Sequence, residues 1–388
     1  MVGILAKLCI KNHTDYRDLQ VRKGYGMLCS VVGIVLNLLL TAVKMIAGVF
    51  SGSVAVVADA VNNLSDAASS LITLLGFWLG GKAPDPEHPF GHGRMEYLAG
   101  LAVSVLILYM GVELLTSSVK SLFAPVAVVL SVPTMILLCI SVPIKLYMFF
   151  YHRSIGKKID SAAMQATAMD SISDAISTSV VIASTVLSAT LGWNIDGICG
   201  ILVSLLILRA GFTSAKDTIS PLLGQPPSKE LVEEIHSMVL SNEMIVGVHD
   251  LVIHNYGPGR MMISLHAEVP ANGDIFLLHD MIDNVERALS AHFACDAVIH
   301  MDPIAVDDKA IASMRIAVAK VIKTLHSDIT MHDFRMVEGP THTNLIFDVC
   351  VPFAFPMKDA QLKSSIEQAI AEQFPHCRAV IKVDKAYV

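Results

Sequence analysis

The segment ATAMDSISD at residues 166–174 follows the same pattern as ADAVNNLSD at residues 58–66. Both segments lie inside apolar runs that are long enough to form helices across a bilayer. In each segment two polar side chains stand four residues apart, so each pair projects from one face of its helix. The four residues are Asn62, Asp66, Asp170 and Asp174. Because an ionised group is costly inside lipid, these positions predict a functional site within the membrane.

If the two helix faces meet, they bring one amide and three carboxylates together. Such an oxygen-only set of ligands suits a hard divalent cation. Polar helix packing, or a water-lined cavity without an ion, is the alternative interpretation. Lys44 and Lys145 also lie within apolar runs, where a lysine either extends its ammonium toward the interface or forms a structural ion pair.

The apolar runs are confined to one part of the chain. Residues 27–214 hold 19 of the 63 charged residues, and the remaining residues hold 44. We therefore expect an all-α, six-helix membrane domain at 27–220, preceded by a cytosolic segment at 1–26 and followed by a soluble part. The expected spans lie at 27–50, 54–79, 95–119, 126–150, 161–191 and 195–214.

The basic residues predict the orientation of these spans. Lys and Arg occur in the N-terminal segment, Arg17 among them, and in the loops after the second and fourth spans, whereas the turns near Ser51 and Trp193 carry none. The positive-inside rule then puts both termini in the cytosol, and we expect a multi-pass protein of the plasma membrane. The net charge of −7 and seven cysteines without a CxxC pattern argue against a nucleic-acid binder and a secreted disulfide scaffold.

The soluble part is expected to form two tandem α+β domains, at residues 221–303 and 307–388. For the first domain the pattern predicts two helices and three strands in a βαββαβ-like fold. These elements lie at 228–240, 246–255, 260–269, 275–293 and 296–301. The second domain repeats the first, because GPGRMMISLHAEVP at 257–270 matches GPTHTNLIFDVCVP at 339–352.

Five positions of the first domain carry residue types that can act as metal ligands. They are His249, His266, His279, His300 and Asp302, and their counterparts in the second domain are His332, Asp348, Ala360, Lys382 and Asp384. If the histidines served only the fold, both domains would keep them. The loss of three histidines predicts that the first domain binds a metal ion and that the second is a degenerate copy. Unrelated surface histidines are the alternative.

The loop between the second and third spans reads APDPEHPFGHGRME at residues 83–96. Asp85, His88 and His92 are spaced three and four residues apart, which suits a small metal site if the segment turns helically. Histidines in a loop rich in Pro and Gly are also common as plain surface residues.

The chain resembles the cation diffusion facilitators over residues 20–303. The resemblance rests on the polar residues of the second and fifth spans, on FGHGRMEY at residues 90–97, and on the HDL, HxE and HxD motifs that begin at His249, His266 and His300. It implies a homodimeric divalent-metal/proton antiporter rather than an enzyme. It also implies a transport site at Asn62, Asp66, Asp170 and Asp174, an interfacial site at Asp85, His88 and His92, and a cytosolic regulatory site at His249, His266, His279, His300 and Asp302.

Two departures from the family pattern matter. Zinc-moving members have a histidine in the transport site, whereas this sequence has Asn62 and Asp170, and an all-oxygen shell favours manganese. The second departure is the extra domain at 307–388. We therefore expect proton-coupled efflux of Mn²⁺ from the cytosol, in which protons compete with the metal for the same carboxylates. Efflux of Zn²⁺ or Fe²⁺ by the same architecture, or a membrane metal sensor that transports nothing, are the alternatives.

Overall fold

The computed structural model describes residues 1–16, 18–51, 54–123, 132–191, 196–304, 309–339 and 341–386. Arg17, Trp193 and the start of the fourth expected span at 126–131 lie outside the described residues. The chain forms two compact units. The helical unit comprises Met1–Gln225 with Tyr256–Arg260, and the α+β unit comprises Pro226–Asn255 with Met261–Val388.

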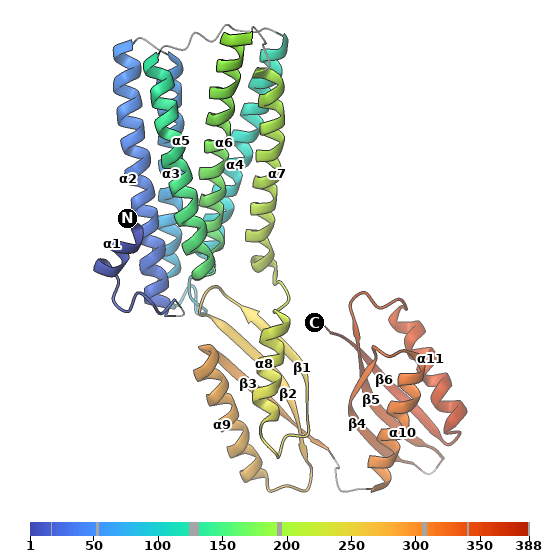
Figure 1. Cartoon of the computed structure of the whole chain (residues 1–388). Helices are drawn as coiled ribbons and strands as arrows, with labels where there is room; N and C mark the ends of the chain where they lie inside the picture. Colours follow the sequence, from blue (N-terminus) through green and yellow to red (C-terminus); the bar gives the residue numbers. More distant parts are fainter. Residues whose placement is uncertain are drawn as a thin grey trace. The chain divides into compact units, whose positions relative to one another are not determined.

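The helical unit is a bundle of long helices that run side by side (Figure 1). A short helix α1 (Val2–Cys9) precedes α2 (Leu19–Ser51), α3 (Val54–Gly80), α4 (Met95–Phe123), α5 (Val132–Lys158), α6 (Ala162–Leu191) and α7 (Asp196–Leu223). Among the described residues, four helices are long and apolar enough to cross a membrane, namely α2, α4, α5 and α7. The two others, α3 and α6, carry the polar pairs Asn62 with Asp66 and Asp170 with Asp174. Six spans are therefore still a prediction, and four have direct support.

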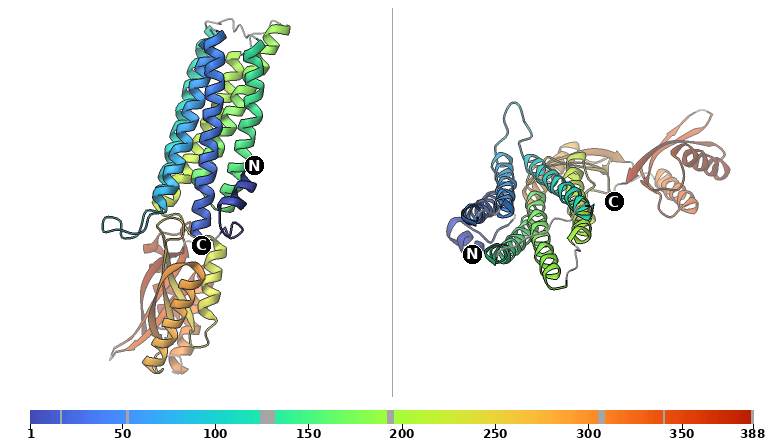
Figure 2. Two further views of the ribbon diagram at one scale, coloured as in Figure 1. Left: turned by 90° about the vertical axis from the view of Figure 1, so that its left-hand side faces the viewer. Right: turned by 90° about the horizontal axis from the view of Figure 1, so that it is seen from above.

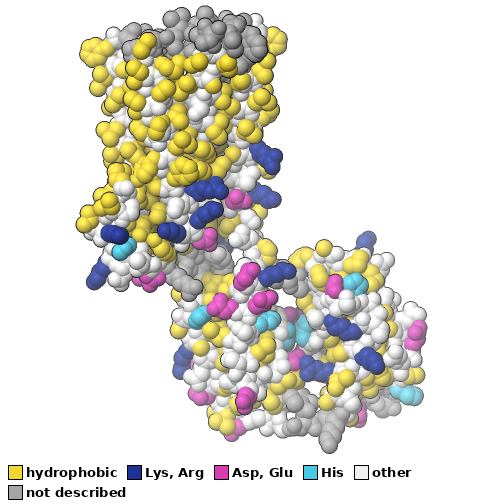
Figure 3. All heavy atoms as spheres, in the orientation of Figure 1, with side chains coloured by type: hydrophobic (Ala, Val, Ile, Leu, Met, Phe, Trp, Pro, Cys, Tyr) yellow, Lys and Arg dark blue, Asp and Glu magenta, His cyan; other side chains and the backbone are white. Residues whose placement is uncertain are grey.

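The bundle places apolar side chains outside and polar ones inside. Hydrophobic side chains cover most of the face of the bundle that Figure 3 shows, and Leu39 and Phe212 are among the exposed hydrophobic residues. Buried positions include many Ser, Thr and Asn side chains. This pattern is the reverse of a soluble core and suits a surrounding of lipid. In the view from above, the long helices are seen nearly end-on and stand next to one another (Figure 2).

One buried ion pair joins several elements near the start of α2. The guanidinium of Arg22 donates to both carboxylate oxygens of Glu96 on α4, at 2.5 and 2.8 Å. Its Nε donates to the carbonyl of Ile159 at 2.7 Å, in the turn between α5 and α6. Fork-like pairing of this kind fixes orientation as well as position, so this end of the bundle is held in one arrangement.

The α+β unit consists of two halves with the same element order. The first half contains α8 (Lys229–Leu240), β1 (Gly247–Asn255), β2 (Met261–Pro270), α9 (Ile275–Phe293) and β3 (Cys295–Ile304). The second half contains α10 (Lys309–Leu325), β4 (Thr330–Glu338), β5 (Thr343–Pro352), α11 (Asp359–Gln373) and β6 (Cys377–Ala386). In each sheet the middle strand, β2 or β5, pairs antiparallel with the strand before it and parallel with the strand after it.

The βαββαβ-like order that we expected is wrong, because each half begins with a helix where that order requires a strand. Ser228 caps α8 by accepting a hydrogen bond from the amide of Leu231, and the apolar residues that follow have helical spacing and enter the core. The observed order is αββαβ. The predicted positions of the elements in the first half agree with the observed ones to within a few residues.

Strand alternation decides what each face of the two sheets carries. In β2, Ile263, Leu265 and Ala267 are buried against the core that α8 and α9 share with the sheet. Ser264, His266 and Glu268 therefore point to the opposite face. In β5 the same rule turns Asp348 to the face opposite the core of the second half. Each half thus has one face covered by helices and one that carries polar side chains.

Candidate metal centres

Three carboxylates meet inside the helical bundle. Asp66 of α3 and Asp170 and Asp174 of α6 place one oxygen each within 4.8 Å of one another. They are 2%, 3% and 6% exposed, respectively. The i, i+4 spacing on α6 and the direct packing of α3 on α6 account for the grouping. Of the four residues predicted from the sequence, the three acids come together.

A lysine that the sequence did not assign to this site completes it. The ammonium of Lys145, on α5, donates to Asp66 Oδ2 at 2.5 Å and to Asp174 Oδ2 at 2.7 Å. Lys145 is 3% exposed, so it does not reach toward the interface. Of the two alternatives for this lysine, an ammonium at the interface or a structural ion pair, the structure has the ion pair. Its partners lie on other helices, and no sequence pattern links it to them.

The amide next to the acids comes from Asn63 rather than from Asn62. The side chain of Asn63 is buried and its Nδ2 donates to Asp66 Oδ2 at 3.1 Å. Asn62 is half-buried and lines a cavity of about 420 Å³ together with Asp59, Asp170 and Asp174. Asp59 pairs with the buried ammonium of Lys44 at 2.8 Å. Asp170 and Asp174 therefore border a space that is large enough for an ion and water.

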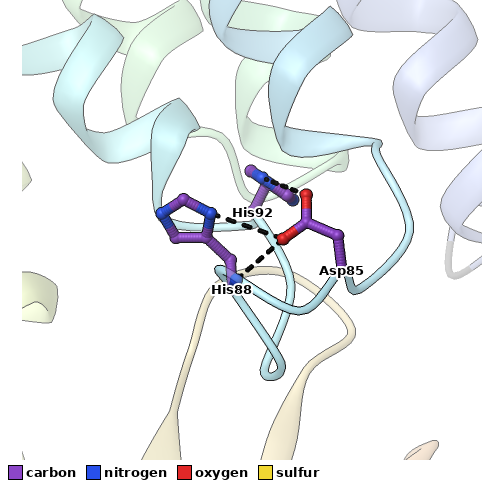
Figure 4. A group of neighbouring side chains, drawn as sticks. All are labelled: Asp85, His88 and His92. Atoms are coloured by element: carbon purple, nitrogen blue, oxygen red, sulfur yellow. Dashed lines mark hydrogen bonds and ion pairs between the residues drawn. The ribbon is translucent and has the colours of Figure 1, made fainter.

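The loop residues Asp85, His88 and His92 also come together (Figure 4). The segment forms turns rather than the helix that the spacing suggested. Asp85 Oδ1 accepts hydrogen bonds from the amides of Glu87 and His88 at 3.1 and 2.7 Å. These bonds lower the pKa of Asp85, with a further contribution from the two imidazoles. The Asp85 carboxylate lies 3.4 Å from His92 Nε2 and 3.6 Å from His88 Nδ1.

The first half of the α+β unit carries a row of histidines across the uncovered face of its sheet. His249 of β1 is paired in register with His266 of β2, and His266 with His300 of β3. Asp302 lies two residues beyond His300 on the same face. Its Oδ2 is 2.8 Å from His266 Nδ1 and 3.1 Å from His249 Nε2, and its Oδ1 is 3.5 Å from His300 Nε2.

These donors fit a divalent metal ion by their chemistry. His249, His266 and Asp302 each place a ligand atom within 4.8 Å of the others. Two imidazoles and a carboxylate are a ligand set that zinc-type ions use. His279 lies on α9 and belongs to none of the metal-ligand groups that the described residues form. Its role in the cytosolic site remains an expectation from the resemblance.

The second half has the same row with different side chains. His332, Asp348 and Lys382 are paired in register across β4, β5 and β6, and Asp384 takes the position that Asp302 has in the first half. The Lys382 ammonium lies 3.5 Å from Asp348 and 3.1 Å from Asp384. Its hydrogen bond to Asp384 raises the pKa of Lys382. Burial and the nearby His249 lower the pKa of His332.

Two family models match the chain. Residues 30–223 match the cation efflux transmembrane domain, and residues 227–304 match the cytoplasmic domain of cation efflux proteins. The second half of the α+β unit lies beyond both matches.

Several curated proteins are similar to this chain over most of their own length. An uncharacterized transporter of Methanocaldococcus jannaschii is 31% identical over 272 residues, which cover 68% of this chain and 95% of the relative. The manganese efflux system protein MneS of Bacillus subtilis is 29% identical over 282 residues, covering 71% and 94%. The cation-efflux pump FieF of Salmonella agona is 29% identical over 296 residues, covering 74% and 96%.

Proposed function

Because the chain belongs to the cation efflux family, whose members are transporters of metal cations rather than enzymes, we propose that it exports Mn²⁺ from the cytosol in exchange for protons. It works as a homodimer in the plasma membrane with both termini in the cytosol. The family relationship supports dimerisation through the cytoplasmic domain at 227–304.

The observation that supports this proposal best is the group of three buried carboxylates, of which Asp170 and Asp174 line the cavity. Asp66 Oδ1 is buried and has no hydrogen-bond partner. A buried acceptor without a partner is costly, and a bound cation removes that cost. The donors at this point are oxygens of Asp66, Asp170 and Asp174, with Asn62 at the cavity wall. A six-coordinate, oxygen-only shell suits Mn²⁺ better than the four-coordinate shell that Zn²⁺ prefers.

Lys145 serves in this mechanism as the cation that the carboxylates hold when cargo is absent. Three ionised carboxylates and one ammonium carry a net charge of minus two, which a divalent ion balances. Cargo needs the same oxygens that Lys145 contacts, so the ion has to displace the ammonium from Asp66 and Asp174. When the ion leaves, the ammonium returns to these oxygens, and protons take up the remaining carboxylate charge. Cargo release therefore never leaves three bare carboxylates in the bundle.

The decisive experiment measures the entry of radioactive manganese into proteoliposomes that carry a pH gradient. Asp66→Asn keeps the shape of the side chain and its hydrogen bond to Lys145 but removes the charge. We expect it to reduce flux by more than the roughly 10–100-fold that the loss of an outer-shell partner costs at metal sites. Asp174→Asn should behave in the same way.

Glu113→Gln is the matched control, since Glu113 lines the same cavity but does not belong to the acidic group. Flux close to wild type in Asp66→Asn and Asp174→Asn would refute the transport site. Uptake that prefers Zn²⁺ or Fe²⁺ over Mn²⁺ would retain the site and overturn the assignment of the cargo. A chain that binds metal but moves none would be a sensor.

A further inference from the structure

The two halves of the α+β unit face each other through His249 and His332. Their rings are stacked with centroids 4.4 Å apart and planes 28° apart. Both histidines lie on the uncovered faces of their sheets, which together line an open cleft of about 930 Å³. A second link joins the halves, because the buried carboxylate of Glu268 on β2 accepts hydrogen bonds from Arg315 on α10 and from the amide of Asp333 on β4.

Three ring nitrogens of the two stacked imidazoles are buried without a hydrogen bond. The His249 side chain is 7% exposed and the His332 side chain is 10% exposed. Neither ring nitrogen of His249 has a hydrogen-bond partner, and His332 Nε2 has none either. Buried polar atoms in native proteins normally have partners. Two of these atoms, His249 Nδ1 and His332 Nε2, lie on the side of Asp250, where one shared partner would satisfy both.

Asp250 supplies a carboxylate at the same point. This residue sits in the β-bulge of β1 with φ of 50°, a conformation that Asp tolerates better than most residues. Its Oδ1 is 3.7 Å from His332 Nε2, and its Oδ2 is 3.6 Å from His249 Nδ1. His249, Asp250 and His332 each place a ligand atom within 4.8 Å of the others.

We propose that the two halves of the α+β unit hold a divalent metal ion between them, bound by His249, Asp250 and His332. Two imidazoles and one carboxylate, with a fourth position for water, suit Zn²⁺ or Co²⁺ rather than Mn²⁺. The second half is then not a degenerate copy but a source of one ligand. The site does not depend on which ion the helical unit exports.

The substitutions in the second half are consistent with this role. Lys382 pairs with Asp348 and Asp384, so its ammonium neutralises the two carboxylates in the row of the second half. His332 Nε2 lies 3.7 Å from Asp250 of the first half and 3.7 Å from Asp384 of its own row. Because the ammonium of Lys382 already engages Asp384, Asp250 is, among the described residues, the carboxylate beside His332 that is free of a lysine partner and can serve a metal ion.

His249 connects the new site to the row of the first half. Its Nε2 faces Asp302 at 3.1 Å, whereas its Nδ1 faces Asp250 at 3.6 Å. A neutral imidazole has one lone pair to offer a metal ion, so His249 serves one of the two sites at a time. An ion between the halves therefore withdraws His249 from the row of the first half, where His266, His300 and Asp302 remain in contact and can hold a second ion. The second half then regulates metal binding by the first.

The test counts the Co²⁺ ions that the full-length chain binds in detergent, by metal analysis together with the visible absorption of Co²⁺. His332→Asn and Asp250→Asn should each lose one bound ion, along with its contribution to the spectrum. His300→Asn alters only the row of the first half and should retain the spectrum of the site between the halves.

His326→Asn is the matched control. His326 is also on the second half, but its carboxylate contact is with Asp328. Circular dichroism and the melting temperature of each variant report whether it is folded. If His332→Asn does not fold, the number of Co²⁺ ions bound by Asp250→Asn tests the site between the halves. An unchanged number of bound Co²⁺ ions and an unchanged spectrum in folded His332→Asn and Asp250→Asn would overturn the proposal.

Discussion

At the scale of single residues, Lys145 is the cation that pairs with the acidic group of the helical unit. Its ammonium contacts two carboxylates of different helices at 2.5 and 2.7 Å. Removing one partner of a buried ion pair is costly because it leaves the other charge without compensation. For Lys145 the charge left behind is the cluster that we assign to the cargo, so its removal should affect cargo binding directly.

We predict that Lys145→Met increases the apparent affinity of the full-length chain for Mn²⁺ by about tenfold, or about 1.4 kcal/mol. The reason is that the metal no longer competes with an ammonium for Asp66 and Asp174. Turnover should fall, because no internal cation remains to help release the ion. Titration with Mn²⁺ and flux in proteoliposomes measure the two effects.

Lys44→Met is the comparison for this variant, since Lys44 is also buried but pairs with Asp59 instead. It should leave Mn²⁺ affinity within about twofold of wild type, a difference of about 0.4 kcal/mol. Equal affinities in wild type and Lys145→Met would show that the lysine does not compete with the cargo.

A second prediction at this scale concerns selectivity. Asp170→His introduces an imidazole into the oxygen-only group, and imidazole is a preferred ligand of Zn²⁺. We expect the ratio of Mn²⁺ to Zn²⁺ flux to fall in this variant, measured with both ions present in the same vesicles. If competition leaves the ratio unchanged, these residues do not select the cargo.

At the scale of elements, the link between β2 and α10 holds the halves of the α+β unit together. Glu268 is 2% exposed, and its charge-assisted bond comes from Arg315 at 3.1 Å. Hydrogen bonds to charged groups contribute more than neutral ones. Because this bond joins elements of different halves, it should stabilise the arrangement that brings His249 to His332.

We predict that Arg315→Met destabilises this arrangement by about 1–3 kcal/mol. Hydrogen exchange of the β4 amides should accelerate accordingly, because the contact between the halves opens more often. Arg287→Met is the control. Arg287 forms an exposed pair with Asp283 within α9, and exposed pairs contribute at most about 1 kcal/mol. Equal exchange rates in the two variants would contradict the role given to Glu268 and Arg315.

At the scale of the whole molecule, the second half is an addition to a unit that has its own core. Each half buries a separate set of apolar side chains. The matched cytoplasmic domain ends at residue 304, before the second half begins. Dimerisation should therefore depend on the first half, and the second half should modify metal binding.

We predict that a chain ending at residue 304 stays dimeric, transports Mn²⁺ and binds one Co²⁺ fewer than the full chain. Light scattering in detergent gives the mass of the assembly, and metal analysis gives the number of bound ions. A monomeric product would mean that the second half takes part in the dimer interface. Co²⁺ binding equal to that of the full chain would contradict the site between the halves.

The sequence alone was sufficient for features that follow from periodicity along one element. Helical spacing predicted that Asp170 and Asp174 share a face, and strand alternation with the matched motifs placed His266 and Asp348 at equivalent positions in the two sheets. Apolar length located the helices, although their ends and the number of supported spans required the structure. These features depend on residues close together in the chain, where backbone geometry fixes the outcome.

Only the tertiary structure decided which of these faces meet. Lys145 is 79 residues from Asp66, and His249 and His332 lie on different sheets. Their contacts result from the packing of whole elements, which no local period encodes. The choice of Asn63 over Asn62 as the partner of Asp66 has the same origin, because adjacent helix positions point about 100° apart and the neighbouring helices determine which one faces the site.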